Sequence, residues 1–371
     1  MRIKRYIPML ALPAAIAAGV FGITTTTSAV AGTTLTGAGS TLVAPFVEDV
    51  FGPDFASKDG INVTYGGGGS GAGVTDISSK SVDFGASDAP LTDAQVAACT
   101  GCVEIPWALA ATGLSYNLSG VAHLNLSGPV IADIFLGTIT NWDSPQIAAL
   151  NKGETLPNLA ITPVWRNDPS GDSYVFSTYL TDVSPAWAGK VGASTTPAYP
   201  VGTGEKGNSG VAAVVASTPG AIGNNSWFYI RQDGLKAAAI ENGAGNYEYP
   251  YEPNLVAAAA LLKTVPDLGS LSATNAGPFA NDLSIVNPSY SKPKKGKKPT
   301  TTQKDEAQAY PLATFTYVIT RPDDPNIADV KEFISFALTS PEQAKGIGGQ
   351  LQFAPLPSAI VTADNKAVAG L

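Results

Sequence analysis

Short apolar runs alternate with segments of helical length along most of the chain. Ile61–Tyr65 and Val82–Gly85 have the length and composition of strands, whereas Gly73–Ser79 and the run that ends at Val50 have helical patterns. This alternation predicts α/β layers with mainly parallel sheets. Ligands of such sheets bind at loops that follow the C-terminal ends of strands, so we expect function in the loops.

Two later segments are candidates for strands that cross between two lobes. They are Trp107–Tyr116 and Tyr310–Thr320, the second of which is β-branched and aromatic. Two crossing strands make a hinge, and about 340 residues after residue 31 permit two cores. We predict lobe I from residues 32–112 and 309–371, and lobe II from residues 113–308.

The N-terminal residues have the pattern of an export signal. Three basic residues precede an apolar run from Ile7 to Ile23, and Ala29-Val30-Ala31 forms a small-x-small cleavage site. We predict a signal peptide at residues 1–31 and a secreted, extracytoplasmic protein, either periplasmic or associated with the cell wall. The apolar run contains two prolines and is short for a spanning helix, and no cysteine near the cleavage site could carry a lipid.

The chain is acidic. Its formal net charge of -8 becomes -11 after residue 31, because residues 1–31 carry three basic and no acidic side chains. Nucleic acid and an anionic membrane are therefore poor partners for the chain as a whole. Any site for an anion must be built locally.

One tract departs from this charge balance. Residues 287–303 contain five lysines among Pro, Gly and Thr, at Lys292, Lys294, Lys295, Lys297 and Lys298. We predict a flexible, poorly ordered surface insertion. It is either a solvated loop or an electrostatic dock for a polyanionic wall or a partner.

Cys99 and Cys102 are the only two cysteines. In an oxidising compartment this Cys-Thr-Gly-Cys motif forms a local disulfide, with a redox-active pair as the alternative. Zinc would need two further ligands, and His123 is the only histidine. We predict no metal site and no cofactor.

Two loops of small residues are candidates for binding an anion. Gly37–Leu42 precedes a helical segment, and Gly66–Gly73 lies between a strand and a helix. Small residues let the backbone approach a ligand, and the free N–H groups of such loops donate to oxyanions. A plain helix cap at Ser40 or Thr41 and a flexible glycine linker are the respective alternatives.

The third candidate loop is Arg166–Ser173, before the helical segment Tyr174–Leu180. The Arg166 guanidinium suits two oxygens of a tetrahedral anion, and Asp168 can hold it in place. Ser170 and the Gly171 N–H would lie at the helix N-terminus. The alternative is a surface ion pair with an ordinary helix cap.

Asp88, after the second short strand, adds a group that can only accept hydrogen bonds. Phosphate near neutral pH retains a proton, whereas sulfate does not. A buried carboxylate therefore selects the protonated oxyanion and repels the unprotonated one. We interpret Asp88 as a specificity device.

Together these loops resemble the phosphate-binding proteins of the Pst-type phosphate ABC transporter, which are PstS-like members of the type II periplasmic binding protein family. The resemblance covers nearly the whole chain after residue 31. It implies two α/β lobes, each with a central mixed β-sheet flanked by helices, joined by two hinge strands. Further segments that carry the resemblance are residues 134–143, 206–211, 219–223, 310–319 and 355–357.

The resemblance also implies a set of phosphate ligands. Asp168 would steady Arg166, and Leu42, where a Phe is frequent, would donate through its backbone. Asp172 stands where a Thr is commoner, so it either lines the site and favours dihydrogen phosphate or turns outward to cap the helix. The implied phosphate-binding residues are Thr41, Leu42, Ser70, Asp88, Arg166, Ser170, Gly171 and Asp172.

The implied function is capture of inorganic phosphate and its delivery to the membrane permease of an ABC importer, by a monomer without catalytic residues. One alternative is a secreted phosphate-ester hydrolase; another is a homologue that binds a different oxyanion, such as sulfate or arsenate. The single histidine, the lack of a metal-ligand cluster and the lack of a Gly-x-Ser-x-Gly motif in the candidate loops argue against an enzyme.

Overall fold

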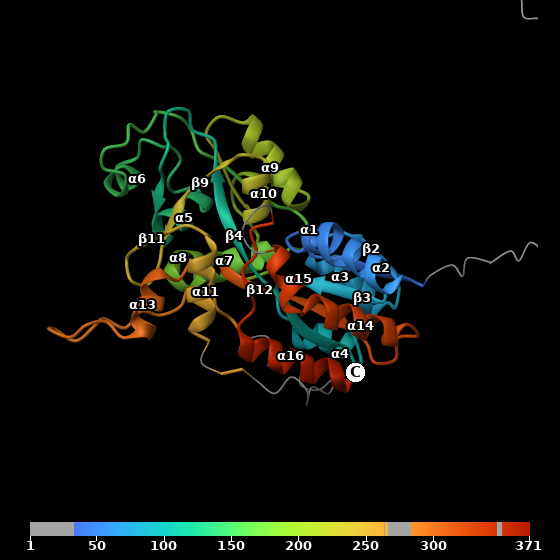
Figure 1. Cartoon of the computed structure of the whole chain (residues 1–371). Coiled ribbons are helices and arrows are strands. Elements are labelled where there is room, and N and C mark those ends of the chain that lie inside the picture. The colour runs from blue at the N-terminus through green and yellow to red at the C-terminus, as the bar shows by residue number, and fades with distance from the viewer. Residues whose placement is uncertain (1–32, 263, 266–282, 347–350) are drawn as a thin grey trace, which may run out of the picture. The chain divides into compact units, whose positions relative to one another are not determined.

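The first sheet is assembled from both ends of the chain (Figure 1). Its strands lie in the order β2-β1-β3-β12-β4; β1 is parallel to β2 and β3, and β12 is antiparallel to β3 and β4. The computed structural model describes residues 33–262, 264–265, 283–346 and 351–371. The strand bounds are β1 Thr34–Gly39, β2 Asn62–Gly66, β3 Phe84–Ser87, β4 Val103–Tyr116 and β12 Ala313–Thr320.

An aromatic cluster packs one face of this sheet against helices. The Trp107 ring centroid lies 5.9 Å from that of Phe51 and 6.2 Å from that of Phe333. Aromatic rings bury large apolar areas, so this cluster holds the helices firmly on the strands. The helices of this lobe are α1 Ala44–Phe46, η1 Val47–Phe51, α2 Gly52–Asp59, α3 Ser70–Ser78, α4 Asp93–Ala98, α14 Ile327–Ala337, α15 Ser340–Gly346 and α16 Ser358–Gly370.

The second lobe has its own mixed sheet. Strand β6 is parallel to β7 and β8, and β4 is antiparallel to β8 and β9. A smaller sheet has the order β11-β10-β5. The strand bounds are β5 Asn125–Leu126, β6 Thr162–Arg166, β7 Thr203–Glu205, β8 Ala221–Ser226, β9 Lys236–Ala237, β10 Ala239–Glu241 and β11 Tyr247–Glu248.

Helices flank the sheets of the second lobe on both sides (Figure 1). Two of them, α7 and α9, follow strands β6 and β7 and place their N-termini at the strand ends. The helix bounds are α5 Gly128–Phe135, α6 Pro145–Leu150, α7 Gly171–Val183, α8 Pro185–Lys190, α9 Gly207–Ser217, α10 Trp227–Gln232, α11 Glu252–Ala260 and α13 Thr301–Gln308.

Strand β4 belongs to both sheets. Residues 103–111 pair with β12, and residues 112–116 pair with β8. The chain returns to the first sheet just before β12, where the Thr112 N–H donates to the Leu312 carbonyl at 3.2 Å. The predicted two-lobed fold with two joining strands is confirmed, and the prediction of mainly parallel sheets is wrong because both lobes have mixed sheets.

Several predicted bounds shift for local reasons. Helix α3 begins at Ser70 rather than Gly73, directly after Gly69, whose φ is 91°. Helix α7 begins at Gly171 because the Ser170 hydroxyl accepts from the Ser173 N–H at 3.3 Å. Strand β3 begins at Phe84, two residues later than predicted.

Three further predictions concern short or irregular segments and the N-terminus. A disulfide joins Cys99 and Cys102 at the end of α4, which confirms the local disulfide. The lysine-rich tract is irregular only to residue 300, because residues 301–303 form the first turn of α13. The predicted signal peptide at residues 1–31 lies outside the described residues. Among the described residues, no helix has the length and hydropathy of a membrane span.

Candidate functional site

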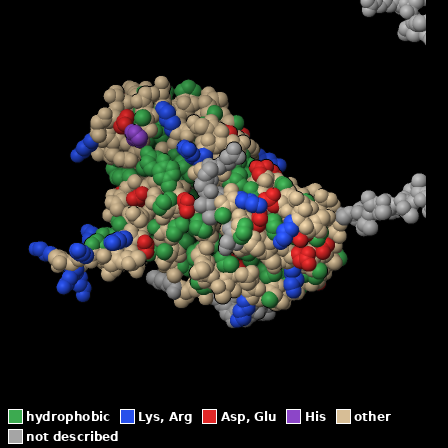
Figure 2. Space-filling view, viewed as in Figure 1, with side chains coloured by type: hydrophobic (Ala, Val, Ile, Leu, Met, Phe, Trp, Pro, Cys, Tyr) green, Lys and Arg blue, Asp and Glu red, His purple; other side chains and the backbone are tan. Residues whose placement is uncertain are grey.

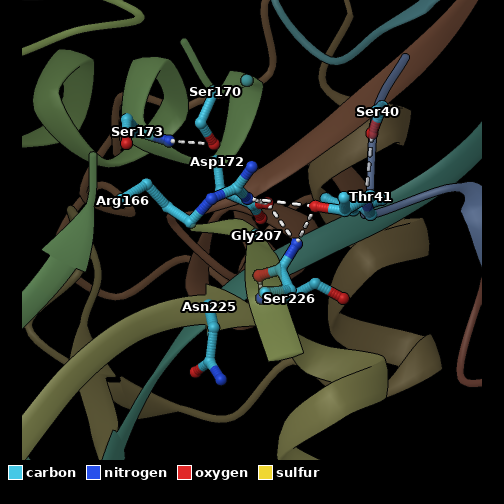
Figure 3. A network of polar contacts seen from close by, with 12 residues as sticks. Ser40, Thr41, Arg166, Ser170, Asp172, Ser173, Gly207, Asn225 and Ser226 are labelled. Atoms are coloured by element: carbon cyan, nitrogen blue, oxygen red, sulfur yellow. Dashed lines mark hydrogen bonds and ion pairs between the residues drawn. The ribbon is translucent and has the colours of Figure 1, made fainter. Parts of the chain in front are cut away.

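The three candidate loops meet between the lobes and form one buried polar network. Figure 3 shows the part of this network around Thr41, Arg166 and Asp172. The loops after β1, β2 and β3 leave the same edge of the first sheet because these strands are parallel. The loop after β6 faces them from the second lobe. All the predicted site residues lie here, and all are buried: Thr41, Leu42, Ser70, Asp88, Arg166, Asp168, Ser170, Gly171 and Asp172.

Arg166, the last residue of β6, is oriented by Asp168. Its Nε donates to Asp168 Oδ1 at 2.8 Å, and its Nη2 donates to Asp168 Oδ2. The Gly207 N–H also donates to Asp168 Oδ1, at 3.0 Å. Burial alone would lower the pKa of Arg166, but its bond to Asp168 and the charge of Asp172 raise it. The guanidinium is therefore a fixed positive charge.

The remaining guanidinium nitrogen points across the cleft. Arg166 Nη1 donates to Thr41 Oγ1 of the first lobe at 3.1 Å and to Asp172 Oδ2 at 3.3 Å. The two sides of the predicted guanidinium fork thus have different partners. Nε and Nη2 bond to Asp168, whereas Nη1 bonds to one residue from each lobe.

Asp172 turns into the network and does not cap its helix. Its side chain is 1% exposed, and its Oδ2 accepts from Asn208 Nδ2 at 2.7 Å. Its Oδ1 is buried and has no partner among the described residues. Burial raises the pKa of Asp172. The cap of α7 is instead Ser170, so the outward orientation considered for Asp172 is wrong.

Asp88 occupies the opposite side of the network. Ser40 Oγ lies 2.6 Å from each carboxyl oxygen, and Ser70 Oγ lies 3.3 Å from Oδ2. Burial, together with the charge of Asp172, raises the pKa of Asp88 to about 7. This carboxyl group therefore exchanges its proton in the neutral range.

Glycines let the loops of the two lobes touch. The Gly171 N–H donates to Ser70 Oγ at 3.0 Å, and the Gly71 N–H donates to the Pro169 carbonyl at 3.1 Å. A Cβ on Gly71 would lie 2.4 Å from Pro169 Cβ, and one on Gly171 would lie 2.5 Å from Asp88 Cβ. Only glycine permits this approach without displacement of a neighbour.

Asn208 and Ser40 bond to the predicted ligands through their side chains but were not predicted as part of the site. Asn208 is fully buried, and its Nδ2 donates to Thr41 Oγ1 at 2.9 Å as well as to Asp172. Its Oδ1 accepts from the Ser226 N–H at 2.7 Å, which fixes the amide orientation. Ser40, considered only as a helix cap, accepts from the Leu42 N–H at 3.0 Å and also donates to Asp88.

The only sequence signal for Asn208 was its position in the resembling segment 206–211. Nothing in that segment showed that a helix N-terminus after β7 would point at the loop after β6. The hydrogen bonds from Asn167 N to Glu205 O and from Gly207 N to Asp168 Oδ1 bring these loops together.

The chemistry of the network is that of an oxyanion site. It offers donors from a guanidinium, hydroxyls and backbone N–H groups, beside two carboxyl groups that accept when ionised. The one histidine, His123, is exposed outside the network. Among the residues that the structure describes, no cluster of His, Cys, Asp and Glu is arranged to bind a metal ion.

Comparisons with known proteins agree in fold and sequence. The model of the PBP superfamily domain matches residues 24–342. The phosphate-binding protein PstS of Xylella fastidiosa (strain 9a5c) is 31% identical over 329 residues, which cover 88% of this chain and 82% of that protein. PstS3 of Mycobacterium bovis (strain BCG / Pasteur 1173P2) is 33% identical over 306 residues, with 80% and 76% covered.

A solved structure gives the same fold at lower sequence similarity. The phosphate-binding protein from Stenotrophomonas maltophilia superposes with a TM-score of 0.63 at 22% identity, over 90% of this chain and 93% of that one. The sequence matches over 80% and 88% of the chain, the matching domain model and the shared fold lead to one conclusion. The chain belongs to the PstS family of phosphate-binding proteins, within the PBP superfamily.

Proposed function

We propose that the protein captures inorganic phosphate between its lobes and delivers it to the membrane permease of a phosphate ABC importer. The observation that carries this proposal is one buried guanidinium, Arg166, which Asp168 orients and which pairs with Asp172, in the same buried network as the carboxyl group of Asp88. A monovalent or divalent phosphate provides oxygens for the guanidinium and protons for the carboxylates. Relatives that carry the name phosphate-binding protein support the same ligand.

The donors follow from the geometry of the network. Thr41 Oγ1 already accepts from Arg166 and Asn208, so its hydrogen is the part left to donate to phosphate. The hydroxyls of Ser70 and Ser170 and the N–H groups of Leu42 and Gly171 complete the set. In the closed structure the Ser70 hydroxyl donates to Asp88, the Leu42 N–H to Ser40 and the Gly171 N–H to Ser70. Phosphate would exchange those partners for its own oxygens.

Closure couples binding to transport. Lobe I, residues 32–112 and 309–371, supplies the ligands from Thr41 to Asp88, and lobe II, residues 113–308, supplies those from Arg166 to Asp172. Each lobe alone offers part of the shell, so phosphate stabilises the closed state, which the permease can recognise. We assign the protein to the extracytoplasmic side as a monomeric binding protein without enzymatic activity.

Asp172 gives the site its own preference among phosphate species. Its partnerless Oδ1 is an acceptor that a second phosphate proton would satisfy. We expect the affinity of the wild type to fall as pH rises past the second phosphate ionisation, and the affinity of Asp172→Thr to fall less. Calorimetry from about pH 5 to about pH 9 measures this, across the range in which phosphate loses that proton. Identical pH profiles for the two proteins rule out this role of Asp172.

Calorimetric titration of purified protein with phosphate, with sulfate as control, tests the function itself. The site predicts saturable phosphate binding with one ion per chain and weak or undetectable sulfate binding. Equal heats and affinities for sulfate would point to another oxyanion site. Arsenate shares the shape and protonation of phosphate, and we expect it to compete.

A further inference from the structure

The largest concentration of positive charge outside the site lies on an exposed excursion before α13. We call residues 291–300 the basic arm. It leaves and rejoins the body at one place, because the Ser291 N–H donates to Glu306 Oε2 and Gln303 Nε2 donates to the Ser291 carbonyl, both at 2.8 Å. Thr300 caps α13 by accepting from the Gln303 N–H at 3.2 Å. The base of the arm is therefore fixed, and the arm projects from the body (Figure 1).

The tip of the arm is a turn. The Lys297 N–H donates to the Lys294 carbonyl at 2.9 Å, and Gly296 has a φ of 77°, a left-handed conformation that favours glycine. The turn spreads the lysines around the tip, where Figure 2 shows them as a separate group of basic side chains. All five are exposed: Lys292, Lys294, Lys295, Lys297 and Lys298.

The charge of the basic arm is not neutralised within the described chain. The five ammonium groups form no ion pair with a described carboxylate, and the arm contains no acidic residue. The five lysines are among 22 basic residues, so 17 others accompany 30 acidic residues. A concentrated basic surface on an acidic body is complementary to an anionic partner.

The composition of the basic arm limits the classes of anionic partner that it can bind. Between Lys292 and Lys298 there is no aromatic residue to stack on nucleic-acid bases and no large apolar side chain to enter a bilayer. A flexible linear polyanion can follow the arm alone. We propose that the basic arm binds a linear polyphosphate, a polymer that carries a phosphate at each repeat and no nucleobases.

The test uses the full mature protein, sodium polyphosphate as the probe, and enough inorganic phosphate to saturate the cleft. One variant carries Lys294→Gln, Lys295→Gln, Lys297→Gln and Lys298→Gln. The matched control removes the same charge elsewhere, with Lys58→Gln, Lys152→Gln, Lys190→Gln and Lys331→Gln. We expect the arm variant to bind polyphosphate about tenfold or more weakly and its salt slope to shrink by about 3, and the control to change by less than about twofold.

Three results would overturn this proposal. They are equal loss in the two variants, no loss in the arm variant, and tighter wild-type binding to phosphatidylglycerol vesicles than to polyphosphate. Calorimetry with inorganic phosphate on both variants checks that their folds are intact. The arm proposal does not depend on the proposed function: if the cleft fails to bind phosphate, the polyphosphate comparison still decides it.

Discussion

Two strands of this protein lead into a buried arginine with an aspartate two positions later, yet only one of these arginines lies in the cleft. Arg166 ends β6 and precedes Asp168, and Arg321 follows β12 and precedes Asp323. The two guanidinium side chains are 1% and 3% exposed. The local sequence pattern therefore does not identify the site.

Strand direction separates the two arginines. Strand β6 is parallel to its neighbours, so its end lies with the other C-terminal strand ends. Strand β12 is antiparallel to β3, so its end lies at the opposite edge of the first sheet. There, Asn326 Nδ2 donates to Asp83 Oδ1 at 2.9 Å, and Asp83 Oδ2 accepts from the Thr36 N–H at the start of β1. Arg321 Nη2 donates to Asp324 Oδ2, and Asp324 Oδ1 accepts from the Asn326 N–H, so Arg321 belongs to the network at the edge away from the cleft.

The two arginines also differ in how far away their hydrogen-bond partners lie along the chain. Arg321 bonds to Asp323, which is 57% exposed, and to Asp324, both within three residues of it. Arg166 bonds to Asp168, to Asp172 and to Thr41 of the other lobe. The bond from Arg166 to Thr41 joins the two lobes, so it forms only when the cleft is closed. The ion pairs of Arg321 fix only its own loop.

Replacing each arginine gives the largest expected contrast. We expect Arg166→Ala to weaken phosphate binding by about 3 to 5 kcal/mol, because it leaves buried carboxylates unpaired. Arg321→Ala should leave phosphate affinity within about twofold and lower the free energy of unfolding by about 3 kcal/mol or more. Calorimetry and urea unfolding measure the two quantities. Comparable loss of affinity in both variants would contradict the assignment.

The buried carboxyl group of Asp88 makes the free energy of unfolding depend on pH. Burial raises the pKa of Asp88 in the folded protein to about 7, above its value in the unfolded chain. Its contribution to stability is therefore complete below about pH 4 and is lost as pH rises towards 7. From about pH 5 to about pH 8, ligand-free wild type should lose about 2 to 3 kcal/mol relative to Asp88→Asn.

Urea unfolding of both proteins at the two pH values measures this difference. Comparison with Asp88→Asn removes the contributions of other buried acids, such as Glu104, whose pKa burial raises to about 8. Parallel pH dependence in the two proteins would show that Asp88 does not titrate in the closed cleft.

A smaller effect is expected from the loop contact itself. Gly71→Ala places a methyl group against Pro169 without removing any phosphate ligand, so it should weaken phosphate binding by about 1 to 3 kcal/mol through impaired closure. Gly189→Ala is the control, since a Cβ there has no neighbour within 4 Å. In the presence of phosphate, small-angle X-ray scattering should give a larger radius of gyration for Gly71→Ala than for wild type. Unchanged affinity would mean that the loops of Gly71 and Pro169 are not in contact when phosphate is bound.

The loops that meet in the cleft could be located from the sequence because their chemistry is local. Glycine runs, a helix cap and an arginine with a nearby aspartate are visible within a few residues, and Ser70, Arg166 and Ser170 were found in this way. Asn208 was missed because its role depends on α9 starting beside the loop after β6, which is a long-range contact. The orientation of Asp172 remained open for the same reason: the sequence does not show which side of α7 faces the other lobe.

The strand bounds show a similar limit. Alternation located β2 and β3 to within two residues, but it predicted mainly parallel sheets because the antiparallel strand β12 comes from the far end of the chain. Only the resemblance supplied that topology.

The central claim is that carboxyl groups, and not net charge, choose the ligand of this cleft. Competition binding of phosphate against sulfate, with wild type and Asp88→Asn at about pH 8.5, where Asp88 is ionised, tests it most directly. The account predicts that the phosphate-to-sulfate affinity ratio falls by about tenfold or more in Asp88→Asn, because the amide can donate to an unprotonated oxygen. An unchanged ratio would contradict the account.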